Sequence, residues 1–538
     1  MQDPTLQPSE MLKFLEEPLN YPHQPSAVEV AQTHASYVAI TEDYVYKLKK
    51  PVDLGFMDFT SPQKRRNNAI REVNLNRRLA EEVYLGVVPL TITQEGEAKL
   101  LDEYKNPEEV PEGYPDYAVK MITLESDYFF KVLMEEGQLK TSDLDRIINK
   151  LVSFYQNQSP NNEVLSNGQI ENIKKNTHDN FRVLYKFIGK TLSQPVLDGI
   201  KYFTDQFFEC NEELFHRRIQ EKKILDLHGD LHLDHIHLHP DRLSIFDCIE
   251  FNNRFRYIDI ANDLAFLAMD LDYIGKHEWS RYIVEQMEEQ LKDDKLKELT
   301  DFYKVYRACV RGKVESIKSS EQEVEEEDRQ EAFNSAQSHL ELALRYTIAG
   351  SGPLVLIVIG NIATGKSTLA ENLAPMLNWP HYDSDRVRKN LAGIEPTKPT
   401  PDHLKQEIYA PDFTDKVYDQ LKSEALKASH KKEGIILDAT YGRKKLRENL
   451  TNALKEHKAP FTFIETHTDE QTIIERLKER APQEHQPSDA RIEDFSDLYH
   501  RYEPPKEVEQ KNLIQINTAL SKQENQARVF KELIDNRL

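Results

Sequence analysis

Hydrophobic positions in the last third of the chain follow two spacings in turn. Short apolar runs, as expected for buried parallel strands, occur at Leu354–Ile359, Ile435–Leu437 and Phe461–Thr466, and a further strand is predicted at His381–Tyr382. Between them, apolar residues recur every three or four positions, which predicts helices at Ser367–Leu377, Val387–Leu391, Asp412–Ser429, Lys444–His457 and Gln471–Arg480. This alternation predicts a parallel sheet with helices on both faces.

The earlier part of the chain has a different order. Residues 1–32 are expected to form a short capping segment, and Tyr37–Lys49 predicts two strands around a turn at Glu42-Asp43. A basic helix is predicted at Gln63–Ala80 and a further strand at Tyr117–Ile122. Helical spacing then dominates, at Thr141–Tyr155, Asn172–Gly189, Gln194–Arg218, Tyr257–Leu271, Arg281–Leu291, Leu299–Ile317 and Ala332–Thr347.

A glycine- and proline-containing stretch, Ala349–Pro353, separates these two parts. At 538 residues the chain is too long for one ordinary core, so we expect a multidomain protein. The predicted domains are residues 1–348 and 349–538.

The segment that follows Leu354–Ile359 reads G-x-x-x-x-G-K-S between a strand and a helix, which is the context of a phosphate-binding loop. Lys366 can supply positive charge to the β- and γ-phosphates of ATP, and the Ser367 hydroxyl can ligate Mg²⁺. The predicted nucleotide-binding residues are Gly360, Asn361, Ala363, Thr364, Gly365, Lys366, Ser367 and Thr368.

Acidic residues follow two other predicted strands of the same sheet. Because carboxyl ends of parallel strands face the ligand crevice, Asp383 and Asp438 are candidate holders of the Mg²⁺ shell. Asp385 is the candidate base for a substrate hydroxyl, and Arg388 is a candidate for binding an anionic group. The alternative for Asp383 and Asp438 is a helix-capping role.

A candidate lid comes last. Arg476 and Arg480 precede the Pro-, Ser- and Gln-rich residues 481–489 and then Arg491. Such a lid would close over a transferring phosphate, with Arg480 or Arg476 stabilising its charge. The alternative is an amphipathic surface helix.

The C-terminal half resembles the P-loop kinases of small hydroxyl substrates. HYDSD is similar to the acceptor segment of shikimate kinases, and DSDRVRKNLAG is similar to segments of polynucleotide kinases, zeta toxins and chloramphenicol phosphotransferases. ERLKER followed by SDAR resembles their lid. The resemblance implies a five-stranded parallel sheet with flanking helices, and it leaves the acceptor open.

A second motif lies in the N-terminal half, where His228-Gly229-Asp230 is followed by Ile245-Phe246-Asp247. It resembles the H-G-D-x-x-x-x-N and I-D segments of aminoglycoside-phosphotransferase-like kinases, whose fold is a protein-kinase-like α+β domain. The resemblance implies that Asp230 is the catalytic base and that Asp247 ligates Mg²⁺. It also implies that Lys47 holds the α- and β-phosphates and pairs with Glu72.

Two departures from that pattern stand out. His235 occupies the place of the metal-binding Asn, although Mg²⁺ prefers oxygen, so Asp234 is a candidate substitute. The nucleotide-covering loop, Thr33–Tyr37, contains no glycine. The N-terminal half is therefore expected to be a weak kinase, or a degenerate kinase that binds its ligand without catalysis. A rival interpretation places His235, His237 and His239 on one strand face, as a zinc or copper site completed by His228 or His232.

Both halves together resemble a bacterial two-domain family described as aminoglycoside-phosphotransferase-like plus AAA-type ATP-binding protein. We expect an ATP- and Mg²⁺-dependent kinase that acts on a hydroxyl of a small molecule, either through the C-terminal domain alone or through both domains. The alternative is a nucleotide-dependent regulatory or toxin-like kinase acting on a protein, a sugar-nucleotide or a polynucleotide 5′-end.

The charge composition of the chain bears on which partners it can bind. Against 70 Lys and Arg stand 92 Asp and Glu, and the resulting net charge of −22 argues against general nucleic-acid or anionic-membrane binding. A polynucleotide end as acceptor stays open, and the oligomeric state is left undetermined. Three scattered cysteines and an N-terminus without signal-peptide features favour the cytoplasm.

Overall fold

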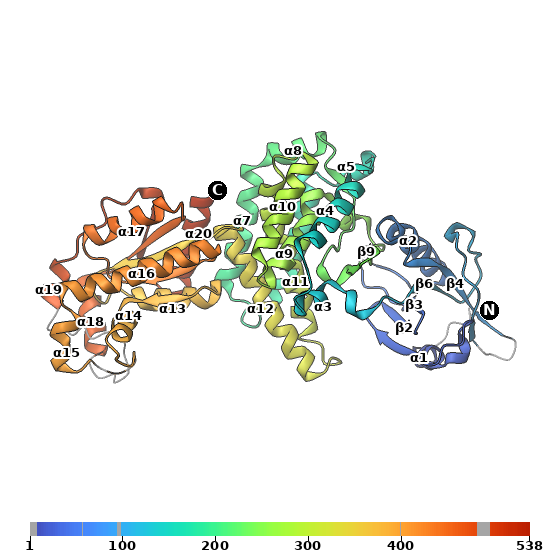
Figure 1. The fold of residues 1–538 in the computed structure, drawn as a ribbon, viewed down its shortest axis with the longest axis horizontal. Coiled ribbons are helices and arrows are strands. Elements are labelled where there is room, and N and C mark those ends of the chain that lie inside the picture. Colours follow the sequence, from blue (N-terminus) through green and yellow to red (C-terminus); the bar gives the residue numbers. More distant parts are fainter. Residues whose placement is uncertain (1–7, 56, 94–97, 397, 399, 481–494) are drawn as a thin grey trace. The chain divides into compact units, whose positions relative to one another are not determined.

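The computed structural model describes residues 8–55, 57–93, 98–396, 398, 400–480 and 495–538 (Figure 1). The chain divides into two compact units. Unit 1 contains Met1–Ile173 and Glu213–Thr300, and unit 2 contains Lys174–Glu212 and Asp301–Leu538. The segments Lys174–Glu212 and 301–348 thus belong to the same compact unit as the C-terminal part of the chain. The domain boundary at 348/349 remains a prediction.

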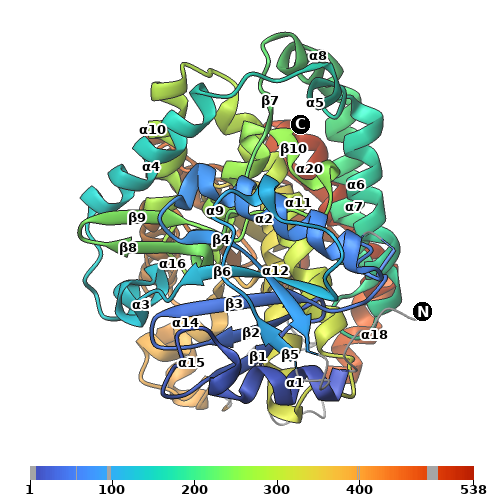
Figure 2. The same cartoon turned by 90° about the vertical axis from the view of Figure 1, so that its right-hand side faces the viewer.

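Unit 1 contains a six-stranded antiparallel sheet with the strand order β1-β2-β3-β6-β4-β5 (Figure 2). The strands are β1 (Glu29–Gln32), β2 (Ser36–Ile40), β3 (Tyr44–Lys49), β4 (Tyr84–Ile92), β5 (Ala98–Leu100) and β6 (Asp116–Ile122). The predicted strand pair in Tyr37–Lys49 is therefore β2 and β3.

The two faces of this sheet are covered by different helices. On β4 and β6, Val87 and Val119 pack with Val73 of α2 (Pro62–Ala80). Their neighbours Val88 and Ala118 pack with residues of α1 (Pro8–Glu16) on the other face. Successive residues of a strand point to opposite faces of the sheet. Because neighbouring residues of β4 and β6 are both apolar, both faces of this sheet are buried.

The rest of unit 1 is mostly helical. It contains α3 (Phe130–Glu135), α4 (Thr141–Gln156), α5 (Asn162–Ser166), α8 (Glu212–Gln220), α9 (Ile260–Tyr273) and α10 (His277–Leu291). Two short antiparallel pairs lie among these helices: β7 (Ile224–Asp226) with β10 (Tyr257–Asp259), and β8 (Ile236–His239) with β9 (Arg242–Ile245).

Unit 2 contains a parallel sheet with the strand order β12-β13-β11-β14-β15. Its strands are β11 (Val355–Gly360), β12 (His381–Asp383), β13 (Ile435–Asp438), β14 (Phe461–His467) and β15 (Leu513–Asn517). The expected five-stranded parallel sheet is present, and the first strand in sequence lies at its centre.

Helices cover this sheet on both faces. Ile357 and Leu437 point toward a cluster that includes residues of α14 (Ser384–Leu391), α16 (Pro411–Lys431) and α17 (Lys444–Glu456). The alternate residues, such as Val358, face the other side, where α13 (Lys366–Leu377) and α20 (Lys522–Arg537) contact strands. The other helices of this unit are α6 (Ile170–Leu184, mostly in this unit), α7 (Gln194–Cys210), α11 (Leu296–Lys318, mostly in this unit), α12 (Glu326–Ala349), α15 (Asp402–Ile408), α18 (Glu470–Arg480) and α19 (Phe495–His500).

Several predicted boundaries were wrong for local reasons. The helix predicted at Gln194–Arg218 is two helices, α7 and α8, because the backbone leaves the helical conformation at Asn211. The start of the helix predicted at Tyr257–Leu271 is strand β10, and α9 begins after Asp259, whose carboxylate accepts a hydrogen bond from Ala261 N (2.8 Å). Strand β15 and helix α20 were not predicted. Among the described residues, no helix combines the length and the apolar character needed to cross a bilayer.

The start of β13 allows a stability test. A methyl group added at Gly434 would lie 1.9 Å from a carbon of the Trp379 indole, which is buried. We expect Gly434→Ala to lower the free energy of unfolding by about 1–3 kcal/mol, since an overpacked core must shift its side chains or backbone. Chemical denaturation measures this loss. Gly352→Ala is the control, because the nearest atom to its added methyl is 3.6 Å away; equal stability of the two variants would contradict the prediction.

Candidate functional site

The loop between β11 and α13 requires glycine at both ends. Gly360 has φ +144°, and a Cβ there would lie 2.4 Å from the main-chain oxygen of Thr466 on the neighbouring strand. Gly365, with φ +93°, precedes the first residue of α13. A side chain at Gly360 would clash with Thr466, and the backbone conformation of Gly365 is one that residues with a Cβ rarely adopt.

Polar contacts within the loop hold its shape. Lys366 Nζ donates to the main-chain oxygen of Asn361 (2.8 Å), and Thr364 Oγ1 donates to the same oxygen (2.9 Å). Ser367 is half-buried in the first turn of α13, and Thr368 is exposed. The predicted phosphate-loop residues thus form one continuous turn at a helix N-terminus, a geometry suited to binding anions.

Two acidic residues meet at the carboxyl edge of this sheet. Asp383 ends β12, Asp438 ends β13, and they are paired in the strand register. Asp383 Oδ1 accepts hydrogen bonds from Asp385 N (2.6 Å) and Arg386 N (2.9 Å), so the predicted alternative of helix capping is met. Both capping hydrogen bonds go to Oδ1, so Oδ2 of Asp383 could ligate a metal ion.

The charges at this edge are not balanced. Burial, together with Asp438 and Asp385, raises the pKa of Asp383 to about 7. Asp438 is 2% exposed, and its Oδ2 has no hydrogen-bond partner among the described residues. His381 Nε2 is 3.7 Å from that oxygen. A divalent cation would relieve the repulsion between the two carboxylates, and oxygen ligands suit Mg²⁺.

Of the arginines predicted to bind an anionic group or to belong to the lid, Arg476 lies beside the phosphate loop, whereas Arg388 is buried in contact with Ile408. Arg476 donates to the Thr518 main-chain oxygen (2.7 Å) and lies 3.4 Å from that of Ala363, beside the phosphate loop. Arg388 is buried and donates to Ile408 O (2.5 Å). The Arg480 side chain and residues 481–491 lie outside the described part of the chain, so their predicted roles remain predictions.

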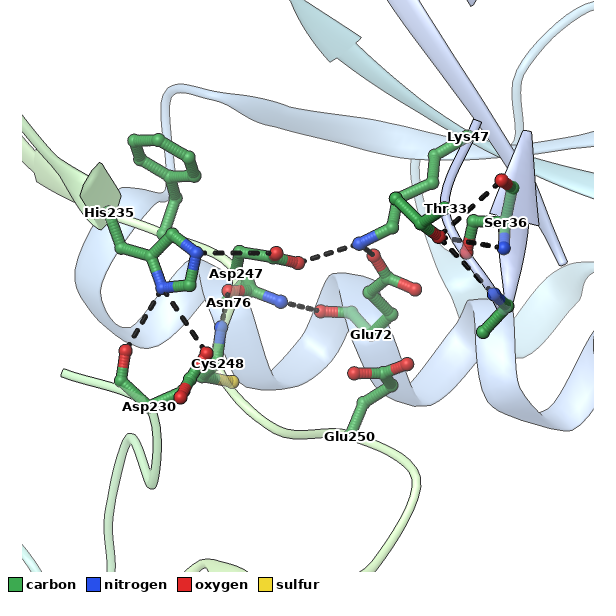
Figure 3. A network of polar contacts seen from close by, with 12 residues as sticks. Thr33, Ser36, Lys47, Glu72, Asn76, Asp230, His235, Asp247, Cys248 and Glu250 are labelled. Atoms are coloured by element: carbon green, nitrogen blue, oxygen red, sulfur yellow. Dashed lines mark hydrogen bonds and ion pairs between the residues drawn. The ribbon is translucent and has the colours of Figure 1, made fainter. Parts of the chain in front are cut away.

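In unit 1, the structure brings Lys47, Glu72 and Asp247 together (Figure 3). Lys47 Nζ lies 2.9 Å from Glu72 Oε1 and 2.6 Å from Asp247 Oδ1. Burial by itself would lower the pKa of Lys47, but Asp247 and Glu72 outweigh it and raise that pKa well above its ordinary value. The pairing of Lys47 with Glu72, expected from the resemblance, is present.

A second lysine shares the Glu72 carboxylate. Lys49 Nζ lies 3.0 Å from Glu72 Oε2 and 2.7 Å from Glu250 Oε1. Glu72 is fully buried; burial would raise its pKa, but Lys47 and Lys49 together lower it. The sequence contained a signal for Lys49 that was missed: residues two apart on a strand point to the same side.

The segment from Asp230 to His235 forms a compact turn close to Asp247. His235 Nδ1 lies 3.7 Å from Asp230 Oδ2, and His235 Nε2 lies 3.6 Å from Asp247 Oδ2 (Figure 3). His232 Nε2 lies 3.4 Å from Asp230 Oδ2, while Lys131 pairs with Asp234 (2.6 Å). Despite burial, which opposes the charge, Asp230 raises the pKa of His232 to about 9.

This turn is anchored by carboxylates that sequence reasoning missed. Asp263 accepts a hydrogen bond from Gly229 N (2.8 Å), and Asp270 accepts one from Leu233 N (2.9 Å). Both are buried on α9, seven residues apart and so on one helix face, which is the signal that could have identified them.

The predicted histidine trio does not form. His235 ends a 3₁₀ turn (Leu233–His235), before β8 begins, whereas His237 and His239 belong to β8. His237 Nε2 lies 2.9 Å from the Glu125 main-chain oxygen. The glycine-free Thr33–Tyr37 loop is instead closed by Thr33 Oγ1, which accepts a hydrogen bond from Ser36 N (3.0 Å).

The comparisons with known proteins cover different shares of the chain. Residues 355–505 match the family model described as an AAA domain. The chain is 31% identical over 423 residues to Rv2004c of Mycobacterium tuberculosis (strain H37Rv), called an uncharacterized protein, covering 78% of this chain and 80% of that protein. A protein of Mycobacterium bovis, Mb2027c, matches with the same identity and coverage. These matches do not address the aminoglycoside-phosphotransferase-like resemblance, which remains a prediction.

Two solved kinase structures are each similar to about a third of the chain. A gluconokinase from Sinorhizobium meliloti 1021 covers 34% of this chain and 91% of its own, with 16% identity and a TM-score of 0.25. The shikimate kinase from Aquifex aeolicus vf5 covers 34% and 98%, with 18% identity and a TM-score of 0.25. At these values neither structure informs on the acceptor.

The charge cluster around Glu72 allows a direct test. Glu72→Gln leaves Lys47 and Lys49 buried with one anion fewer, and loss of one partner of a buried ion pair costs about 3–5 kcal/mol. We expect a loss of this size in the free energy of unfolding, measured by urea denaturation. Glu81→Gln, at the exposed end of the same helix, is the control and should change stability by less than about 0.5 kcal/mol. A Glu72→Gln protein as stable as this control would refute the prediction.

Proposed function

The chain belongs to the same protein family as Rv2004c of Mycobacterium tuberculosis, and on that premise we propose that its C-terminal domain transfers the γ-phosphate of ATP to a hydroxyl group of a small molecule. The observation that carries this proposal is the placement of a lysine-bearing glycine loop beside two facing carboxylates at the edge of one parallel sheet. A parallel sheet with its ligands at the carboxyl ends of the strands is the common arrangement for nucleotide chemistry.

The residues present fit ATP. At Gly360 the close approach to Thr466 leaves no room for a side chain, and the loop from Asn361 to Gly365 leads into the N-terminus of α13, where its backbone N–H groups would surround phosphate groups. Lys366, now hydrogen-bonded across the loop, would move its ammonium onto the β- and γ-phosphates. Arg476, beside Ala363, adds positive charge at the same loop.

The carboxylates fit Mg²⁺, because Asp383 and Asp438 lie next to one another and neither is paired with a lysine or arginine among the described residues. Bound Mg²⁺, with Ser367 and these two acids around it, supplies positive charge that stabilises the phosphates. Neutralisation at this edge also favours the ionised form of Asp383.

Asp385 is the proposed base. It lies in the first turn of α14, two residues after Asp383, whose carboxylate fixes that turn. The acceptor hydroxyl would give its proton to Asp385 as its oxygen forms a bond to the γ-phosphorus, and the bond from that phosphorus to ADP breaks. This leaves a phosphorylated product, ADP and a protonated carboxyl group.

A second candidate function belongs to unit 1, and the ion pair between Lys47 and Glu72 favours it. By this proposal Lys47 would bind the phosphates of a second nucleotide, Asp230 would act as base, and Asp247 would ligate Mg²⁺. The present pairing of Lys47 with Asp247 would have to open for this to happen. For either domain, we expect the reaction to take place in the cytoplasm.

The first test removes the loop lysine. Lys366→Ala should lower phosphoryl transfer by about 100- to 1000-fold, because a positioned positive charge at the phosphates is lost. A metabolite pool incubated with γ-labelled ATP measures transfer and identifies the acceptor, whether a small molecule, a sugar-nucleotide or a polynucleotide 5′-end. Lys445→Ala, exposed on α17, is the control and should retain transfer. Wild-type transfer by Lys366→Ala would refute the role of this loop.

Two carboxylate variants distinguish the activity of the C-terminal domain from that of unit 1. Asp385→Asn should abolish most transfer while ATP binding, measured by calorimetry, stays within about twofold of wild type, since proton acceptance is lost and the phosphate loop is intact. Asp230→Asn should leave that transfer unchanged if only the C-terminal domain acts. Loss of a distinct labelled product in Asp230→Asn alone would establish a second active site.

A further inference from the structure

A cluster of nitrogen and oxygen ligands in unit 1 is not explained by the phosphotransfer proposed for the C-terminal domain. Asp230, His232 and His235 each offer one ligand atom, and these three atoms lie within 4.8 Å of one another. Asp230 Oδ2 is 3.4 Å from His232 Nε2 and 3.7 Å from His235 Nδ1. Ligands around a metal ion with bonds of about 2.0–2.2 Å lie roughly 3–3.5 Å apart, so small rotations of the two imidazoles would complete such a set.

We propose that Asp230, His232 and His235 form a binding site for a divalent transition-metal ion. Two imidazoles and one carboxylate favour ions such as Zn²⁺, Fe²⁺ or Co²⁺ over Mg²⁺, which prefers oxygen ligands. Three protein ligands leave coordination positions open, as in metal sites that bind a further molecule. The open side lies at Asp230, whose side chain is 35% exposed, whereas those of His232 and His235 are 9% and 13% exposed.

The outer nitrogen of each histidine faces a second carboxylate. His232 Nδ1 lies 3.4 Å from Asp234 Oδ2. His235 Nε2 lies 3.6 Å from Asp247 Oδ2, as Figure 3 shows. Histidines that ligate metals commonly pair their other nitrogen with a carboxylate, which orients the ring and makes the ligating nitrogen a better donor. Each histidine of this cluster has a carboxylate within 3.6 Å of that nitrogen, and a small shift of the side chains would form the hydrogen bond, since His232 Nδ1 has no hydrogen-bond partner among the described residues.

The backbone that carries the three ligands is held in place before any metal binds. His232 N donates to the main-chain oxygen of Asp230 (3.0 Å), and His235 N donates to that of His232 (3.1 Å). Asp270 holds the intervening Leu233 N (2.9 Å). Because the turn is already ordered, binding pays little further conformational entropy.

One contact competes with the metal. His235 Nδ1 lies 3.0 Å from the main-chain oxygen of Asp230, and a bound ion would replace this hydrogen bond. The metal would also occupy a carboxylate oxygen that the second candidate function assigns to proton transfer. Metal ligation and general-base catalysis by Asp230 are therefore alternatives, and metal binding can be tested independently of phosphotransfer at Lys366.

The experiment titrates Co²⁺ into the full-length, tag-free protein after removal of metals, in the presence of millimolar Mg²⁺ to fill sites made of oxygen ligands. We expect visible absorption from Co²⁺ bound at about one equivalent, and displacement of the Co²⁺ by Zn²⁺. His235→Asn, which replaces an imidazole by an amide, should weaken Co²⁺ binding by at least about 100-fold. Asp234→Asn, which removes the carboxylate beside His232, should weaken it by about 10-fold.

His239→Asn is the matched control, since His239 lies on β8 outside the cluster and should keep binding within about twofold of wild type. Circular dichroism verifies folding, and His232→Ala replaces His235→Asn if the latter does not fold. The proposal is overturned if wild type shows no Co²⁺ or Zn²⁺ binding at micromolar concentrations. It is equally overturned if the His235 and His232 variants bind Co²⁺ as wild type does, which would leave the cluster a hydrogen-bonded turn.

Discussion

Unit 1 depends on how the charge of Glu72 is neutralised. The carboxylate comes from α2 and is fully buried, and a lone buried carboxylate would be too costly to keep ionised. Two lysines of β3 supply the compensating charge, and each of these lysines binds a further acid, Asp247 or Glu250. These ion pairs tie α2, β3 and the segment after β9 into one arrangement, so the charges that define the candidate site also hold the elements that carry it.

In unit 2, by contrast, two buried carboxylates lack compensating lysines or arginines among the described residues. The parallel register of β12 and β13 places Asp383 opposite Asp438, and no lysine or arginine is paired with either carboxylate among the described residues. Burial and like charge together raise the pKa of Asp383. Where unit 1 neutralises its acids with its own lysines and histidines, unit 2 leaves a pair of acids beside a loop built to surround anions. This difference in charge balance makes unit 2 the better candidate for the proposed binding of nucleotide and Mg²⁺.

The histidines of unit 1 illustrate how a single substitution relative to a family pattern can change the chemistry available. At His235 the resemblance expects an amide oxygen, yet the imidazole reaches toward Asp230 with one nitrogen and toward Asp247 with the other. Together with His232, it turns a site expected to contain only oxygen ligands into a mixed one. The ligand set then favours softer ions than Mg²⁺.

Local patterns in the sequence determined the phosphate loop, the central strand before it and the helix after it, because glycine requirements and apolar runs act over a few residues. They also indicated the strand that carries Lys47 and the turn that carries Asp230. Tertiary structure decided which distant charges meet: Lys49 with Glu72, Asp263 and Asp270 with the turn at Asp230, and Thr518 with Arg476. It also decided that His235 leaves the strand of His237 and His239. Local spacing can place Lys49 on the same side of its strand as Lys47, and Asp263 and Asp270 on one helix face. Which distant residue each of them meets follows from packing and strand register, because these contacts join elements far apart along the chain.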